Sequence, residues 1–178
     1  VDYDMVPSVV YTNPEIAWVG VLGRLWGPSP ERGLYRTIDG GKSWKRVLAV
    51  DEKTGCIDVA LCPGKPDTVL AAMYERQRDE FDVGDPKKRW GPGSGLYRST
   101  DAGKSWEIIG NGLPARFPHS VEAMTLEEAG GECQIIAATT GGDVLCSTDA
   151  GASWRTVVSG LGPISKGGHW QNMAGLVS

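Results

Sequence analysis

Short runs of β-branched and aromatic residues alternate with polar, glycine-containing turns along most of the chain. In three places two such runs flank the same kind of polar octapeptide. The runs before it are 33–36, 95–98 and 143–146, and those after it are 45–48, 107–109 and 155–158. Because apolar runs of this length bounded by turn residues are typical of strands, each octapeptide is predicted to be the turn of a β-hairpin.

The octapeptide follows one pattern, S/T-x-D-x-G-x-S-W, at 37–44, 99–106 and 147–154. Its hydroxyl and carboxylate can accept hydrogen bonds from backbone N–H groups in the turn. Glycine at the fifth position permits a positive φ, and the tryptophan can pack back over the hairpin. We therefore predict a structural role for its residues. They are Thr37, Asp39, Gly41 and Trp44; Ser99, Asp101, Gly103 and Trp106; and Ser147, Asp149, Gly151 and Trp154.

A second pair of apolar runs precedes each hairpin, at 6–12 and 16–22, 56–62 and 68–74, and 121–126 and 133–139. Four short antiparallel strands in each repeat of ~40–50 residues are the pattern of a β-propeller blade. The chain is therefore predicted to be all-β, one propeller region with a tail at 159–178. Its blades are expected at about 4–50, 55–110 and 118–158.

Three blades are few, because propellers usually close with about 4–8. Three alternatives stay open: a piece of a larger propeller, a homo-oligomer that completes a ring, or an open arc capped by its tail. We favour a partial propeller.

Composition and charge limit the classes of partner and cofactor that can be expected. The 178 residues carry a formal net charge of -4 and no basic run, so nucleic acid is not an expected partner. No apolar stretch approaches the roughly 20 residues of a membrane helix, so no membrane span is expected. No cofactor motif is present: G-K-S at 41–43 and 103–105 lacks the earlier glycine of a phosphate loop.

The four cysteines, Cys56, Cys62, Cys133 and Cys146, show neither a C-x-x-C pair nor zinc-ligand spacing. We predict that all four are buried, unpaired small apolar residues and that the chain binds no metal. No signal-peptide pattern opens the sequence, although its first residue is Val1. Both features favour a cytoplasmic location over an extracellular or periplasmic one.

The octapeptides resemble the Asp-box, or bacterial neuraminidase repeat, of sialidases, xyloglucanases, sortilin-like receptors and many uncharacterised bacterial proteins. Residues 22–36 resemble sortilin-type bacterial repeat proteins often labelled glycosyl hydrolases, and 162–170 resemble the close of shorter repeat proteins of cytoplasmic type. The resemblance covers about 16–170 and implies a propeller. It implies less about function, because the repeat occurs in enzymes, receptors and assembly factors alike.

Two further resemblances are weaker. A sialidase relative should carry three arginines for the substrate carboxylate and a tyrosine nucleophile; these cannot be assigned, and no F/Y-R-I-P segment is present. Residues 4–20 resemble the entry to the interface domain of dihydrolipoamide dehydrogenases. That family's redox cysteine pair and G-x-G-x-x-G are absent, so we interpret these residues as strand, turn and strand of the first blade.

Candidate binding residues lie on the two longest predicted loops, 23–33 and 75–95, which share the face opposite the octapeptides. Each loop carries W-G-P beside arginines. Because tryptophan and arginine suit stacking on a sugar or holding a carboxylate, Trp26, Arg32, Arg76 and Trp90 are the candidates. In the alternative interpretation each tryptophan covers its loop base and the arginines are solvated.

Candidate catalytic carboxylates are Asp58 and Glu122, which are predicted at matching positions of the innermost strands. A pair of carboxylates beside a groove could serve glycoside hydrolysis. A residue recurring at one blade position is more simply explained as a structural feature of the repeat.

We therefore predict a non-catalytic binding or scaffold propeller that binds a glycan or protein partner through these loops. The main alternative is a glycoside hydrolase, sialidase- or xyloglucanase-like, or a fragment of one. A third class is a structural assembly factor.

Overall fold

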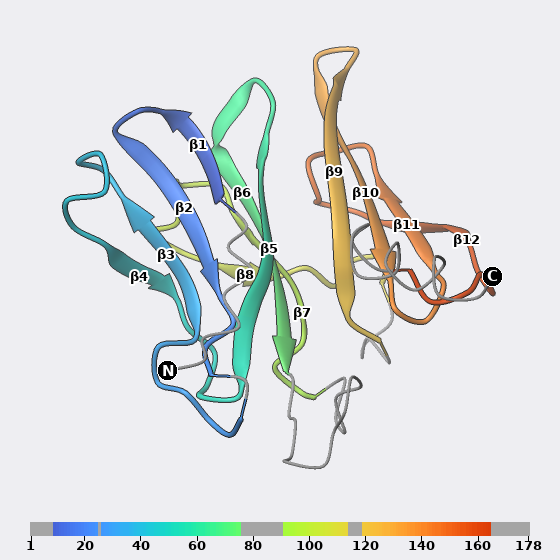
Figure 1. Cartoon of the computed structure of the whole chain (residues 1–178). Helices are drawn as coiled ribbons and strands as arrows, with labels where there is room; N and C mark the ends of the chain where they lie inside the picture. Colours follow the sequence, from blue (N-terminus) through green and yellow to red (C-terminus); the bar gives the residue numbers. More distant parts are fainter. Residues whose placement is uncertain (1–8, 25, 76–90, 114–118, 165–178) are drawn as a thin grey trace, which may run out of the picture.

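The computed structural model describes residues 9–24, 26–75, 91–113 and 119–164, in which every regular element is a β-strand (Figure 1). The strands form three four-stranded antiparallel sheets, each in chain order. Blade 1 holds β1 (Val9–Asn13), β2 (Ile16–Val21), β3 (Gly33–Thr37) and β4 (Lys45–Leu48). Blade 2 holds β5 (Thr54–Cys62), β6 (Lys65–Glu75), β7 (Gly95–Ser99) and β8 (Glu107–Ile108). Blade 3 holds β9 (Val121–Ala129), β10 (Glu132–Thr139), β11 (Val144–Ser147) and β12 (Arg155–Val158). The all-β, blade-type prediction is confirmed.

The start of the chain supports the strand interpretation of the dehydrogenase-like segment. Within its described part, β1 pairs antiparallel with β2. The Asn13 side chain accepts hydrogen bonds from the backbone N–H groups of Glu15 (2.8 Å) and Ile16 (3.0 Å), which closes the tight turn between the strands. Residues 9–21 are therefore strand, turn and strand.

The blades stand side by side, with β5 in contact with β2 on one side and β9 on the other (Figure 1). The hydrophobic cores lie between the sheets. Strand β6 serves both cores, because successive side chains of a strand point to opposite faces: Val69 joins the core shared with blade 1, and Leu70 joins the core shared with blade 3. Burial on both faces explains why residues 69–74 form a continuous apolar run.

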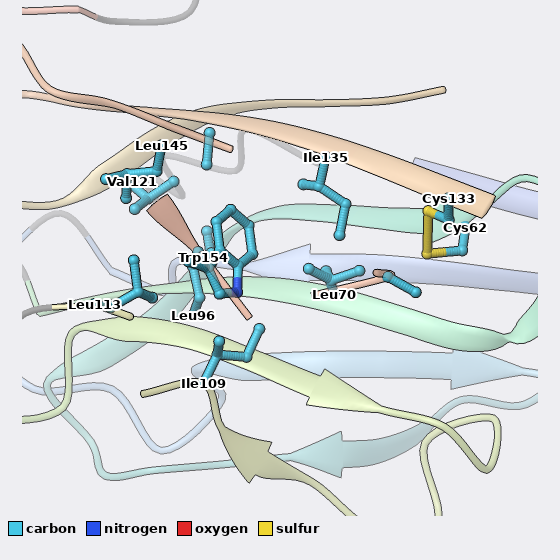
Figure 2. Packing of buried hydrophobic residues seen from close by; sticks show 13 residues of the cluster. Cys62, Leu70, Leu96, Ile109, Leu113, Val121, Cys133, Ile135, Leu145 and Trp154 are labelled. Carbon is cyan, nitrogen blue, oxygen red and sulfur yellow. A yellow bond between two sulfur atoms is a disulfide. The ribbon is translucent and has the colours of Figure 1, made fainter. Parts of the chain in front are cut away.

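Figure 2 shows the core between blades 2 and 3, where Leu70, Leu96 and Ile109 of blade 2 surround the Trp154 indole. Val121 and Leu145 of blade 3 lie on its other side. This layered packing holds neighbouring blades in a fixed relation.

A disulfide joins Cys62 of β5 to Cys133 of β10, with their Cα atoms 5.6 Å apart (Figure 2). The prediction of four unpaired cysteines is therefore wrong for this pair. The two residues are 71 positions apart, and only the packing of blade 2 against blade 3 brings them together. Cys56 and Cys146 lie outside this disulfide.

Candidate functional site

Antiparallel strands divide the turns between two ends of the molecule. We call the end with the octapeptide turns (37–44, 99–106 and 147–154) the box end, and each octapeptide a box. The opposite, loop end carries the segment 22–32 between β2 and β3 and, in blade 2, residues 91–94 before β7. In Figure 1 the 22–32 segment lies at the lower edge and the first box at the upper left.

The boxes use their polar groups internally. In blade 2 the Ser99 hydroxyl accepts the N–H of Gly103 (2.7 Å) and donates to the Asp101 carboxylate (2.8 Å). That carboxylate also accepts the N–H and the hydroxyl of Ser105 (2.9 and 2.6 Å). The backbone N–H of Ala102 donates to the Asp67 carbonyl near the start of β6 (2.9 Å). Blades 1 and 3 repeat these bonds, so each box is tied to the hairpin formed by the first two strands of its blade.

The same hydrogen bonds keep the box carboxylates ionised. Bonds from Ser43 and Thr37 lower the pKa of Asp39 to about 2. For Asp149 desolvation opposes the change, but bonds from Ser153 and Ser147 still lower the pKa to about 2. Hydrogen bonds led by Ser105 likewise lower the pKa of Asp101. Carboxylates held in this state are hydrogen-bond acceptors and poor proton donors.

At the loop end of blade 1, Arg32 braces the 22–32 segment. Its side chain is only 3% exposed, and Nη2 donates to the carbonyls of Arg24 (3.0 Å) and Gly27 (3.2 Å). Arg32 was a candidate for contact with a ligand. Its burial instead places it beneath the loop, where it holds the turn that carries Trp26.

Trp26 is 44% exposed on this braced loop. The loop base is fixed at further points: the Ser29 N–H donates to the Glu52 carbonyl (2.8 Å), and the Tyr35 hydroxyl donates to the Glu31 carbonyl (2.9 Å). The Ser29 hydroxyl donates to the Glu31 carboxylate (2.5 Å) and so lowers its pKa. Trp26 is therefore an exposed aromatic ring on a rigid support.

Blade 2 repeats the support. The Tyr97 hydroxyl donates to the Gly93 carbonyl (3.4 Å), as Tyr35 does to Glu31. The Glu75 carboxylate is buried directly beneath this turn, since a Cβ placed on Gly91 would lie 1.8 Å from its Oε2. The other two binding candidates, Arg76 and Trp90, lie outside the described residues.

A hollow of about 220 Å³ opens between the 22–32 segment and the chain that leaves β4. It is lined by Pro30, Arg46, Ala49, Val50, Asp51 and Glu52. Arg46 donates to the carbonyls of Pro30 and Arg32 and so closes one side. Its lining combines the apolar residues Pro30, Ala49 and Val50 with charged groups of both signs. Sequence reasoning missed it, because 49–52 is a connection between blades without any motif.

The carboxylate candidates do not occupy matching positions. Asp58 is buried opposite Ala72, and its Oδ1 accepts the Val59 N–H (3.0 Å). In blade 3 the residue opposite the equivalent Ala138 is Ala123. The expected match with Glu122 is therefore wrong by one residue, because bulges interrupt the register of both innermost strands. The side chain of Glu122 lies outside the described part of the chain.

Two absences complete the description. In the described ranges no three histidine, cysteine, aspartate or glutamate side chains come together as metal ligands. The same residues include no helix long and apolar enough to cross a membrane.

No protein-family model matches the chain. Over 87 residues, 49% of this chain, the sequence is 31% identical to a probable oligoxyloglucan-reducing end-specific xyloglucanase of Neosartorya fischeri. The match covers 10% of that protein, so this chain spans about a tenth of the relative's length.

Solved structures share the architecture. YCF48 bound to a D1 peptide is similar over 92% of this chain and 45% of its own, with a TM-score of 0.53 and 16% identity. The GH74 xyloglucanase from Xanthomonas campestris is similar over 84% of this chain and 22% of its own, with a TM-score of 0.52 and 18% identity. Both are β-propellers. The chain is built of propeller blades.

Proposed function

We propose that this chain is a non-catalytic carbohydrate-binding module that holds a glucan chain across Trp26 and the hollow to which Pro30 of the same segment contributes. The exposed indole on its braced loop carries the proposal. The apolar face of a pyranose ring can stack on it, while Arg46, Asp51 and Glu52 of the hollow can hydrogen-bond to sugar hydroxyls. The partial sequence match to a xyloglucanase supports a β-glucan as the ligand.

The chemistry near Trp26 favours binding over hydrolysis. Glycoside hydrolysis by the common route needs one carboxylic acid with a raised pKa beside a second carboxylate. Hydrogen bonding to Ser29 moves the pKa of Glu31 in the opposite direction. Asp58 is buried and bonded to its own strand.

Binding is tested by titrating xyloglucan oligosaccharides into the protein in a calorimeter. We expect Trp26→Ala to weaken binding at least tenfold, a loss of about 1.4 kcal/mol or more. Trp44→Ala is the matched control, because Trp44 is also 44% exposed but lies at the box end. Equal affinity in Trp26→Ala and the unmodified chain would overturn the proposal.

A contribution to glycoside hydrolysis is the second candidate, favoured by the same xyloglucanase match. It predicts release of reducing ends from xyloglucan. That release should be lost in Asp51→Asn or Glu52→Gln while oligosaccharide binding persists. Binding without release supports the module; release that depends on these carboxylates supports the hydrolase.

A further inference from the structure

Blade 1 packs against blade 2, and blade 2 packs against blade 3; we call each of these two contacts a joint. The two joints have the same arrangement, and the first is the joint between blades 1 and 2. Trp18 of β2, fully buried, lies against the box of blade 2, where its ring centroid is 6.5 Å from that of Trp106. The approach is tight: a Cβ placed on Gly103 would lie 2.7 Å from the Trp18 ring. Arg36 lies over Trp18 (5.0 Å to the ring centroid), and its Nη1 donates to the Ala102 carbonyl (3.1 Å).

The second joint repeats this arrangement with different side chains. Leu70 replaces Trp18, because it pairs with Arg98 as Trp18 pairs with Arg36. A Cβ on Gly151 would lie 3.4 Å from Leu70 and 3.5 Å from Arg98. Nη1 of Arg98 donates to the Ala150 carbonyl (3.3 Å). In both joints, therefore, the earlier blade packs an apolar side chain and an arginine against the box of the following blade.

Among the described residues, one half of this joint lies open on the outer face of blade 1 and the other half on the outer face of blade 3. In blade 1 the box is uncovered: Trp44 is 44% exposed, whereas Trp154, which the preceding blade covers, is 6% exposed. Among the described residues, a Cβ on Gly41 would meet the ring of Trp44 alone, at 3.9 Å. In blade 3 the inserting position holds Ile136, which pairs with Cys146 and is 48% exposed. An uncovered box and an uncovered inserting residue therefore lie on opposite outer faces.

We propose that these two faces bind each other between two copies of this chain. Ile136 of one copy packs on the Gly41–Trp44 part of the box of the other, and the reciprocal contact forms at the same time. The contact continues the plan of the two internal joints. Two copies related by a two-fold axis would bring six of the described blades into one ring, within the usual range of about 4–8, and cover both faces.

One residue difference makes the joint between two copies weaker than the joints within the chain. Cys146 stands where Arg36 and Arg98 stand in the other blades, so this position supplies no guanidinium for the Gly40 carbonyl of the partner box. The intermolecular joint therefore has an apolar contact without the accompanying hydrogen bond. We expect a dimer that dissociates reversibly on dilution.

The test is molar mass by light scattering behind size exclusion over a concentration series. We expect twice the chain mass of 19.0 kDa at high concentration. Ile136→Asp should give the monomer mass throughout, and circular dichroism would verify that it remains folded. Ile108→Asp is the matched control: Ile108 is 65% exposed but lies on β8, away from both outer faces, so its dimer should persist.

A variant that is expected to strengthen the dimer provides a second test. Cys146→Arg restores the missing donor and should lower the dimer dissociation constant at least tenfold. A monomer at every concentration that Cys146→Arg does not alter would overturn the proposal and assign the open faces to blades of a longer chain. A molar mass that keeps rising with protein concentration would overturn the closure of a six-blade ring and would indicate an open filament. Trp26→Ala should leave the dimer intact, which separates this result from glucan binding.

Discussion

At the scale of single residues, two neighbouring box positions face different constraints. Positions four and five both have positive φ: 68° at Gly40 and 82° at Gly103. Alanine already occupies position four in the other two boxes, at φ 57° and 56°. At position five a methyl group in blade 2 would meet the Trp18 ring at 2.7 Å. At position four, backbone strain alone disfavours a side chain. At position five, contact with the neighbouring blade disfavours it as well.

Substitution by alanine separates these two costs. We expect Gly40→Ala to reduce the free energy of unfolding by roughly 1 kcal/mol, the cost of a left-handed alanine, because its Cβ has no contact closer than 3.5 Å. Gly103→Ala should lose about 1–3 kcal/mol more, because the joint must move apart. Urea unfolding midpoints of the two variants measure the difference. Equal losses of unfolding free energy in the two variants would show that the Trp18 ring moves aside at no cost.

At the scale of elements, the strands and boxes could be predicted from sequence, whereas the cysteine pair and the hollow could not. A box such as 99–106 is specified by bonds between residues two to four apart, so its chemistry is visible in the octapeptide. The Cys62–Cys133 contact depends on blade packing. Likewise the burial of Arg32 depends on how its own loop closes, and W-G-P followed by arginine does not show that closure.

Box chemistry predicts a specific acid sensitivity. The pKa of Asp39 falls from 3.8 to about 2 on folding, so its ionised form stabilises the folded state above about pH 4. This contribution is lost as pH falls from about 4 toward 2. We expect Asp39→Asn to be less stable at pH 7 and to show a shallower loss of stability in that window. Urea unfolding at a series of pH values measures the slope, and an unchanged slope would contradict the assignment.

At the scale of the whole molecule, covalent linkage is uneven: the described disulfide joins blade 2 to blade 3, while blade 1 is held to blade 2 by packing around Trp18 and Leu34. The pairing also removes one basis for the cytoplasmic prediction, since disulfides persist mainly in oxidising compartments. That location stays a prediction. Alkylation in denaturant without reductant should label two thiols, and alkylation in denaturant after reduction should label four.

The disulfide should dominate the stability of the joint that it spans. A cross-link closing 71 residues restricts the unfolded chain, which on the chain-entropy estimate is worth about 4 kcal/mol. We expect reduction to lower the urea midpoint of the unmodified protein by a corresponding amount. The paired variant Cys62→Ala, Cys133→Ala should unfold at that lower midpoint with or without reductant. Because Cys56 and Cys146 remain in the variant, any residual response to reductant would have to come from them. Identical midpoints for oxidised and reduced protein would mean that packing alone holds blades 2 and 3 together.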